Sequence, residues 1–332
     1  MTASAATAIG KARKQGLLVR KPTSLWQDAW YRLWRNKAAV AGMVVIAFFA
    51  LVAICAPLIA PYHPLDIPLP SNTLRQAAWV RTANPSTTGD WRFILGTDNV
   101  GHDVLSEVIY GARTSMVVGF VPMFLIIILG TTIGMVAGFF GGRVDSLLMR
   151  LTDVVYAFPA LLLFIIVMSA LRDTAIGKLL NGLFLLFVSL SIVNWVGVAR
   201  LVRGQVLSLK RREFIEAAYV VGASGPRIMF RHLLPNSLAP IIVVGAFLIP
   251  QAILTEATLG FLGLGIRPAS DPSAIFQISW GMLLLWGRDA MRSQPWLLLA
   301  PALCIALVML SFTFVGDGLR DALDPMMRGT TA

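Results

Sequence analysis

Residues 213–255 read EFIEAAYVVGASGPRIMFRHLLPNSLAPIIVVGAFLIPQAILT, a segment rich in charge, glycine and proline that leads into an uncharged apolar run. The run at 233–255 is long enough to cross a membrane, because an α-helix needs roughly 20 residues to span about 30 Å of hydrocarbon. The stretch therefore predicts a membrane-spanning helix that is preceded by a polar segment outside the bilayer.

The same pattern recurs along a chain of 332 residues, of which 57% are apolar and 14% are charged. Soluble domains carry roughly 25% charged residues, so this composition excludes an ordinary soluble domain. Five further uncharged runs have about the length of a span: 38–62, 114–142, 154–171, 179–199 and 293–316. The sequence therefore predicts an all-α integral membrane protein with six transmembrane helices.

The distribution of charge predicts the orientation of these helices. The net charge is +11, which by itself is also typical of nucleic-acid-binding proteins. With the N-terminus inside, however, 19 of the 28 lysines and arginines fall in segments on the cytoplasmic side. This bias follows the positive-inside rule, so both termini are expected in the cytoplasm. The bases are then expected to contact anionic lipid, and no nucleic-acid partner is expected.

The predicted spans divide the chain into segments. In the first segment, helical spacing places Trp26, Trp30, Leu33 and Trp34 on one stripe, which is typical of a helix lying in the membrane interface. Between the last two spans, the glycine-rich stretch 259–295 predicts a re-entrant or interfacial outer segment. The expected segments are a cytoplasmic N-terminal segment (1–37), a first transmembrane helix (38–60), an outer, periplasmic loop (61–113), a core domain with five transmembrane helices (114–316) and a cytoplasmic tail (317–332).

The polar segment before the fifth span has the pattern of two short helices. One helical stripe is formed by Phe214, Ala217, Ala218 and Val221. Gly222 can adopt the left-handed conformation that ends this helix, and Ser224 can cap a second one. Helices this short are not stable alone, so they need a surface to pack against. From the residues alone, that surface is either the protein's own bundle or a partner.

The sequence EAAYVVGASGPRIMFRHLLPN (216–236) resembles the cytoplasmic loop of bacterial importer permeases of the ATP-binding cassette (ABC) class. Glu216, Ala217, Ala218 and Gly222 fall on the defining positions of that loop. The resemblance implies that the loop is a coupling helix between spans four and five, which docks into a groove on a cytoplasmic ATPase. The residues it implies at this contact are Glu213, Phe214, Glu216, Ala217, Ala218, Gly222 and Arg227.

Further motifs resemble the second permease subunit of dipeptide and oligopeptide importers: WRNKAAVAG (34–42), LGTDNVGHDVLSEVIYGART (95–114), LGFLGLG (259–265) and VGDGLRDALDP (315–325). This resemblance implies the type I ABC importer permease architecture in a bacterial inner membrane. The implied function is to form the translocation pathway of an ATP-driven peptide importer together with a partner permease. The implied partners are that permease, two cytoplasmic ATPases that bind ATP and magnesium, an extracytoplasmic solute-binding protein, the lipid bilayer and the peptide.

The outer-loop motif differs from the family pattern at one position. The motif residues are Gly96, Thr97, Asp98, Gly101, His102 and Asp103. His102 stands where the family usually has arginine, which puts in doubt any role that needs a fixed charge there. His63, Asp98, His102 and Asp103 also raise the question of a metal. They lack the tight spacing of a ligand set, so no metal is expected.

Three polar or aromatic residues in the spans are candidates for lining the pathway: Asn194, Trp195 and Glu256. The sequence has no G-x-x-x-x-G-K-[ST] phosphate loop, so the chain itself is not expected to hydrolyse ATP and no cofactor is expected on it. One alternative is a related importer of nickel or another small solute. A second is an ion-coupled transporter or channel, which the scarcity of mid-span charge disfavours.

Overall fold

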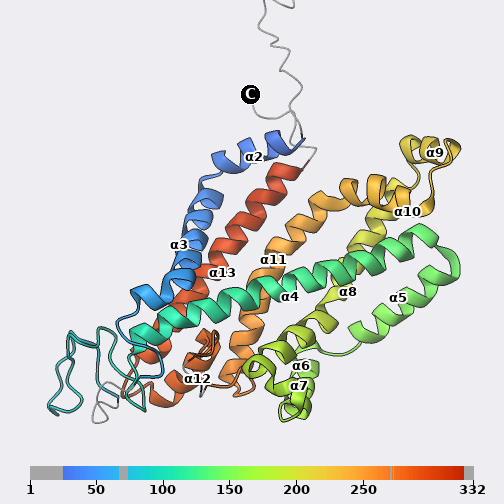
Figure 1. Ribbon diagram of the computed structural model, residues 1–332. Coiled ribbons are helices and arrows are strands. Elements are labelled where there is room, and N and C mark those ends of the chain that lie inside the picture. Colours follow the sequence, from blue (N-terminus) through green and yellow to red (C-terminus); the bar gives the residue numbers. More distant parts are fainter. Residues whose placement is uncertain (1–24, 67–73, 270, 272, 325–332) are drawn as a thin grey trace, which may run out of the picture.

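The computed structural model describes residues 25–66, 74–269, 271 and 273–324, and these residues form helices joined by loops, without a strand. Five helices are long and apolar enough to cross a membrane: α3 (Lys37–Ile59), α4 (Val104–Phe140), α8 (Leu183–Leu209), α11 (Leu234–Phe261) and α13 (Trp296–Leu323). Figure 1 shows them side by side in one bundle. The predicted N-terminal segment, outer loop and C-terminal tail are described only in part, because residues 1–24, 67–73 and 325–332 lie outside the described residues.

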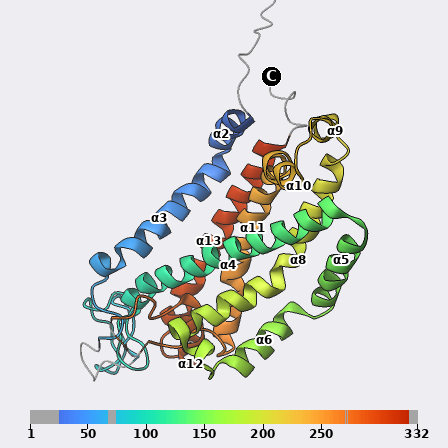
Figure 2. The same ribbon diagram turned by 45° about the vertical axis from the view of Figure 1, so that its right-hand side comes forward.

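A sixth span depends on how two bent helices are counted. The run at 154–171 was expected to form one helix, but α5 (Gly142–Tyr156) and α6 (Ala160–Leu171) meet at an angle of 80°. Pro159 precedes α6 and disfavours the helical conformation at Phe158, which explains the break. Figure 2 shows the two helices on the open side of the bundle. The described residues thus contain five spans, or six if this pair crosses the membrane as a broken helix.

Helices α4 and α8 pack closely because α4 carries three glycines four residues apart, at positions 130, 134 and 138. A Cβ atom at Gly130 would lie 2.6 Å from Cβ of Val198, and one at Gly138 would lie 2.8 Å from Cβ of Val206. Gly134, between them, faces the Ala199 carbonyl group at still closer range. Glycines at this spacing allow such close approach between helices in a membrane.

One end of the bundle is closed by the loop between α3 and α4 and by α12 (Trp280–Ala290). The Gln294 Nε2 atom donates hydrogen bonds to the carbonyl oxygens of Arg75 at 2.6 Å and Leu95 at 3.0 Å. Trp280 is fully buried, and its indole Nε1 donates to the Val108 carbonyl at 2.9 Å. The stretch 259–295, expected to be re-entrant or interfacial, is therefore an irregular segment and a short helix that pack against α4, α11 and α13.

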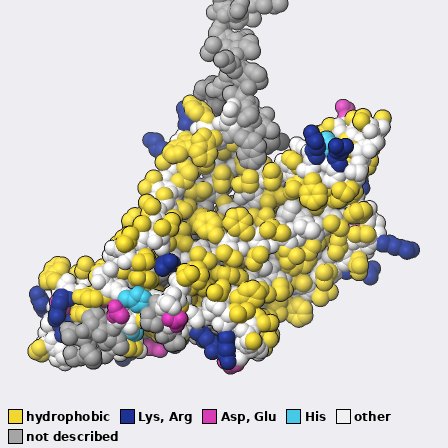
Figure 3. Space-filling model, in the orientation of Figure 1, with side chains coloured by type: hydrophobic (Ala, Val, Ile, Leu, Met, Phe, Trp, Pro, Cys, Tyr) yellow, Lys and Arg dark blue, Asp and Glu magenta, His cyan; other side chains and the backbone are white. Residues whose placement is uncertain are grey.

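The opposite end carries α2 (Leu25–Arg35) and a helical hairpin, α9 (Glu213–Val220) and α10 (Gly225–Ile228), as Figure 1 shows. Leu33 of α2 is buried with Ala39 and Ala322, whereas Trp30 and Trp34 are exposed. The aromatic stripe predicted for this helix is thus divided between the bundle and the outside. Figure 3 shows hydrophobic side chains over the long helices, which is the surface that a bilayer would cover.

Candidate functional site

The segment between α8 and α11 folds as a helix, a turn and a second helix. Gly222 has a φ of +83° in the turn, as expected for the residue that ends α9. The backbone N–H of Ala223 donates to the Ala218 carbonyl at 3.0 Å, which closes the end of the helix. Ser224 lies at the start of α10, but its side chain makes no capping hydrogen bond, unlike the expectation. The chain then passes through a π-helical turn, Met229–Leu233, into α11.

Two buried isoleucines attach this hairpin to the bundle. Ile215 of α9 and Ile228 of α10 are both completely buried in the main core. The predicted helical stripe is less buried than these isoleucines: Phe214 is 43% exposed, and Ala218 is half-buried. The other residues implied at the ATPase contact are exposed: Glu213, Glu216, Ala217, Gly222 and Arg227. The hairpin is therefore anchored mainly by Ile215 and Ile228, with Ala218 and Ala223 packed against the same core, and most of its other residues face outward.

The tip of the hairpin is apolar, which was not expected. Val220 is 88% exposed and Val221 is 87% exposed, next to the turn at Gly222. Two adjacent exposed valines at the end of a short helix form a small apolar surface that a protein partner could cover. Helical periodicity placed Val221 on a stripe expected to pack on either the bundle or a partner, and its exposure leaves it free for a partner.

A second feature lies where α5 and α6 break. A cavity of ≈ 710 Å³ opens between this break and the middle of α8 and α11. Its polar lining includes Tyr156, Asn194 and Gln251, and its apolar lining includes Phe158 and Leu248. The Asn194 Nδ2 atom donates to the Leu190 carbonyl at 3.0 Å, which fixes one side of the amide. The mixture of amide, phenol and apolar groups suits a solute that carries both peptide groups and side chains.

The three residues proposed to line a pathway do not lie together. Asn194 lines the cavity, whereas Trp195 is 4% exposed and packs beside Val196 and Ala199. Glu256 is completely buried between α11 and α12, where its Oε1 atom accepts a hydrogen bond from the Ser279 hydroxyl at 2.6 Å. Sequence reasoning missed Tyr156, Phe158 and Gln251, because their position depends on a helix break that the apolar run did not reveal.

Ion pairs hold α5 against α8 on one side of this cavity. The Arg203 guanidinium donates to both oxygens of Asp145, at 2.5 and 2.6 Å. Arg200 donates to Asp153 at 2.7 Å and lies 4.6 Å from the centre of the Tyr156 ring. A two-point contact between guanidinium and carboxylate fixes orientation as well as distance. The side of the cavity formed by α5 is therefore held by these ion pairs and by Val155, which packs against Trp195, Val196 and Ala199.

The outer-loop motif forms a compact turn just before α4. Gly96 and Gly101 have φ values of +82° and +110°, and Asp98 Oδ1 accepts backbone hydrogen bonds from Val100, Gly101 and His102. Asp103 caps α4 by accepting from the Ser106 backbone N–H at 2.9 Å. Burial raises the pKa of the Asp103 carboxyl above its ordinary value, although its hydrogen bonds with Ser106 oppose the shift. The motif thus orders the entry of the chain into α4.

Comparison with known proteins covers almost the whole chain. A family model described as "binding-protein-dependent transport system inner membrane component" matches residues 130–329. A second, described as the N-terminal TM domain of oligopeptide transport permease C, matches residues 24–77.

Among curated proteins, the oligopeptide transport system permease protein OppC of Bacillus subtilis is 37% identical over 98% of this chain and 96% of its own length. OppC of Escherichia coli is 40% identical over 92% of each chain. The dipeptide transport system permease protein DppC of Alkalihalophilus pseudofirmus is 41% identical over 92% of this chain and 91% of its own length.

The apolar helices and the similarity along their whole length define a multi-pass membrane transport protein. The chain belongs to the family of inner membrane components of binding-protein-dependent transport systems, with the type I ABC permease architecture.

Proposed function

We propose that this chain is the permease subunit of an ATP-driven dipeptide or oligopeptide importer, in which it forms one side of the translocation pathway. The observation that carries the proposal is the similarity to peptide permeases over at least nine-tenths of the chain. The cavity beside Asn194 and Gln251 supports it, because it offers amide groups to a peptide backbone and apolar walls to side chains.

The proposed partners follow from two features of the surface, the α9–α10 hairpin and the cavity beside Asn194. The hairpin α9–α10, with its valine tip, docks into a cytoplasmic ATPase, and a second permease covers the open side of the cavity. Two ATPases bind ATP and magnesium and supply hydrolysis, so this chain performs no catalysis and carries no nucleotide. An extracytoplasmic solute-binding protein delivers the peptide at the end that carries the loop before α4. Movement of the ATPases is transmitted through α9 and α10 to α8 and α11.

The proposed location is a bacterial inner membrane, with both termini in the cytoplasm. Support comes from the grouping of α2, the hairpin and the end of α13 at one end of the bundle (Figure 1). The segments that contain these elements hold most of the lysines and arginines, as the positive-inside rule requires of a cytoplasmic end.

Uptake by the reconstituted complex tests the function. The chain, its partner permease, the ATPases and the binding protein are placed in proteoliposomes and offered labelled dipeptides, longer peptides and Ni²⁺. The proposal expects ATP-dependent accumulation of at least one peptide class and none of Ni²⁺. Accumulation of Ni²⁺ without peptide would identify the alternative importer, and uptake that follows an ion gradient without ATP would identify a secondary transporter.

A further inference from the structure

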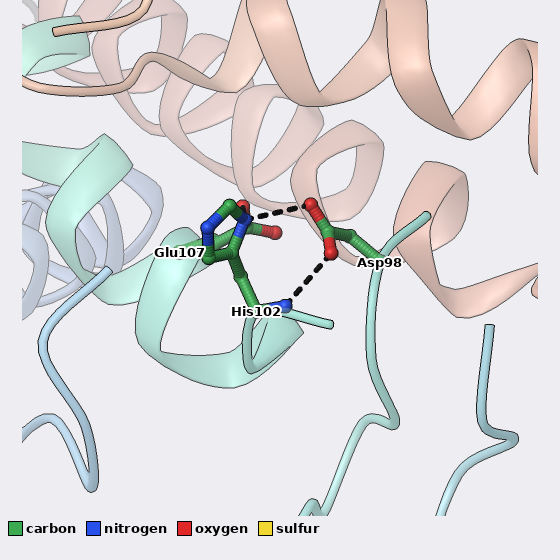
Figure 4. A group of neighbouring side chains, drawn as sticks. All are labelled: Asp98, His102 and Glu107. Carbon is green, nitrogen blue, oxygen red and sulfur yellow. Dashed lines mark hydrogen bonds and ion pairs between the residues drawn. The ribbon is translucent and has the colours of Figure 1, made fainter. Parts of the chain in front are cut away.

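Asp98, His102 and Glu107 meet at the outer end of α4, as Figure 4 shows. The imidazole of His102 lies between the two carboxylates. Its Nδ1 atom is 2.9 Å from Asp98 Oδ2 and 3.7 Å from Glu107 Oε1. The three ligand-type atoms lie within 4.8 Å of one another, although Asp98 and His102 come from the loop and Glu107 comes from the helix.

Glu107 is the unusual member of this group. Its side chain is completely buried, and neither of its carboxylate oxygens has a hydrogen-bond partner among the described residues. Both oxygens of Asp98, in contrast, are hydrogen-bonded. A buried carboxylate without a donor is costly unless a cation compensates its charge or a proton neutralises it. The Nδ1 atom of His102 lies 3.7 Å from Glu107 Oε1.

We propose that Asp98, His102 and Glu107 form a binding site for a divalent transition-metal cation of the zinc type. Imidazole and carboxylate together are ligands that zinc accepts, and three protein ligands leave a fourth position for water. His102 is 15% exposed, so the site opens to the outside through the histidine. Two carboxylates and a neutral imidazole around a divalent ion also give no net charge, which removes the cost of the buried Glu107 carboxylate.

The two distances at His102 Nδ1 can be met by a metal ion, whereas only the shorter one can be a hydrogen bond. With zinc–ligand bonds of about 2.0–2.1 Å, the two separations at His102 Nδ1, 2.9 and 3.7 Å, correspond to angles of about 90° and 130° at the metal. A hydrogen bond accounts for the first separation, but 3.7 Å is too long for the second. A tetrahedral site needs its ligand atoms about 3.3 Å apart, so the two carboxylates must approach each other by up to about 1.5 Å, given the 4.8 Å limit on the group.

Asp98 is also oriented for this role. Three backbone N–H groups, from Val100, Gly101 and His102, hold its Oδ1 atom at 2.6–2.8 Å and turn Oδ2 toward the imidazole. Such contacts fix a metal ligand before the ion arrives. A bound ion would join the loop to the first turns of α4 and so hold the outer loop on the bundle. The sequence did not predict a metal here, because it did not indicate that Glu107 lies beside His102. The folded structure brings the two side chains together.

Zinc binding by the full chain tests the proposal. The chain is purified without a histidine tag, stripped with a chelator, loaded at micromolar free Zn²⁺, and desalted before metal analysis. We expect about one Zn²⁺ per chain, and an X-ray absorption spectrum with one imidazole and oxygen ligands at about 2.0 Å. At about 100 times the dissociation constant, Zn²⁺ should raise the unfolding midpoint by about 4 °C. Mg²⁺ at the same concentration should not, because it favours all-oxygen octahedral sites.

Variants separate the metal from the competing arrangement, a protonated His102 that bridges the two carboxylates. His102→Arg places a fixed charge between Asp98 and Glu107, so it should fold without zinc and bind less than about a tenth of the parental amount. Glu107→Gln should also lose zinc. His63→Gln, which removes another histidine at the same end of the bundle, should keep it. The proposal is overturned if the parent binds no zinc under these conditions, or if His102→Arg binds as much as the parent.

Discussion

The Ser279 hydroxyl donates a 2.6 Å hydrogen bond to Glu256 Oε1 and accepts a 3.2 Å hydrogen bond from the Met282 backbone N–H, and it thereby connects α11 to the start of α12. Both side chains are completely buried. Gly281 makes the approach possible, because a Cβ atom there would lie 2.8 Å from Glu256 Oε1. One hydroxyl therefore both caps a helix and satisfies an oxygen of a buried acid.

Replacing this hydroxyl should destabilise the end of the bundle that carries α12. Ser279→Ala removes a cap and leaves Glu256 Oε1 without a donor, which together cost about 2–4 kcal/mol. Ser279→Thr, which keeps the hydroxyl, is the matched control. Thermal unfolding of the chain in detergent measures the difference. A midpoint for Ser279→Ala equal to that of the parent would show that the Ser279–Glu256 contact contributes nothing to stability.

The glycines of α4 give a second prediction. Gly134→Val forces side-chain atoms against the Ala199 carbonyl, so α4 and α8 must separate at a cost of about 1–3 kcal/mol or more. Gly204→Ala in α8 is the control, because no atom lies within 4 Å of a Cβ there and alanine favours a helix. We expect a lower unfolding midpoint for Gly134→Val only. Equal midpoints would contradict close packing at this contact.

Much of the fold could be predicted because it depends on local patterns. Uncharged runs mark the spans, glycines four residues apart mark the face of α4 that another helix can approach closely, and Gly222 marks the turn after α9. The break between α5 and α6 was missed, because Pro159 lies within an apolar run that reads as continuous. The environment of Glu107 was missed for another reason. Its burial depends on packing between distant segments, such as Trp280 against Val108, that no periodicity encodes.

The orientation of the chain can be tested by labelling. After Cys55 and Cys304 are replaced by alanine, single cysteines are introduced at Ser86 and Ser208, both of which are exposed. The proposed orientation expects an impermeant thiol reagent added outside intact spheroplasts to modify the cysteine at 86 and to spare the one at 208. Permeabilised cells, in which both react, provide the control. The reverse pattern in intact spheroplasts would invert the proposed orientation.

Two substitutions test different parts of the proposed contact between the α9–α10 hairpin and the ATPase. Val220→Arg places a charge on a side chain that is 88% exposed, so its effect on folding should be small. Gly222→Val resists the φ of +83°, at a cost of about 1–2 kcal/mol, although no atom lies within 4 Å of a Cβ at this position. Gly222→Asn is the control, because asparagine tolerates this conformation better than valine does.

The most direct measurement is co-purification of the ATPases with each variant, followed by ATP-driven uptake in proteoliposomes. Pairing with the partner permease and the unfolding midpoint are recorded on the same preparations. We predict that Val220→Arg and Gly222→Val still insert and pair but lose the ATPases and uptake, while Gly222→Asn keeps both. If Val220→Arg and Gly222→Val retain the ATPases and transport at the parental rate, the hairpin is not the coupling element and the account of its exposed tip is wrong.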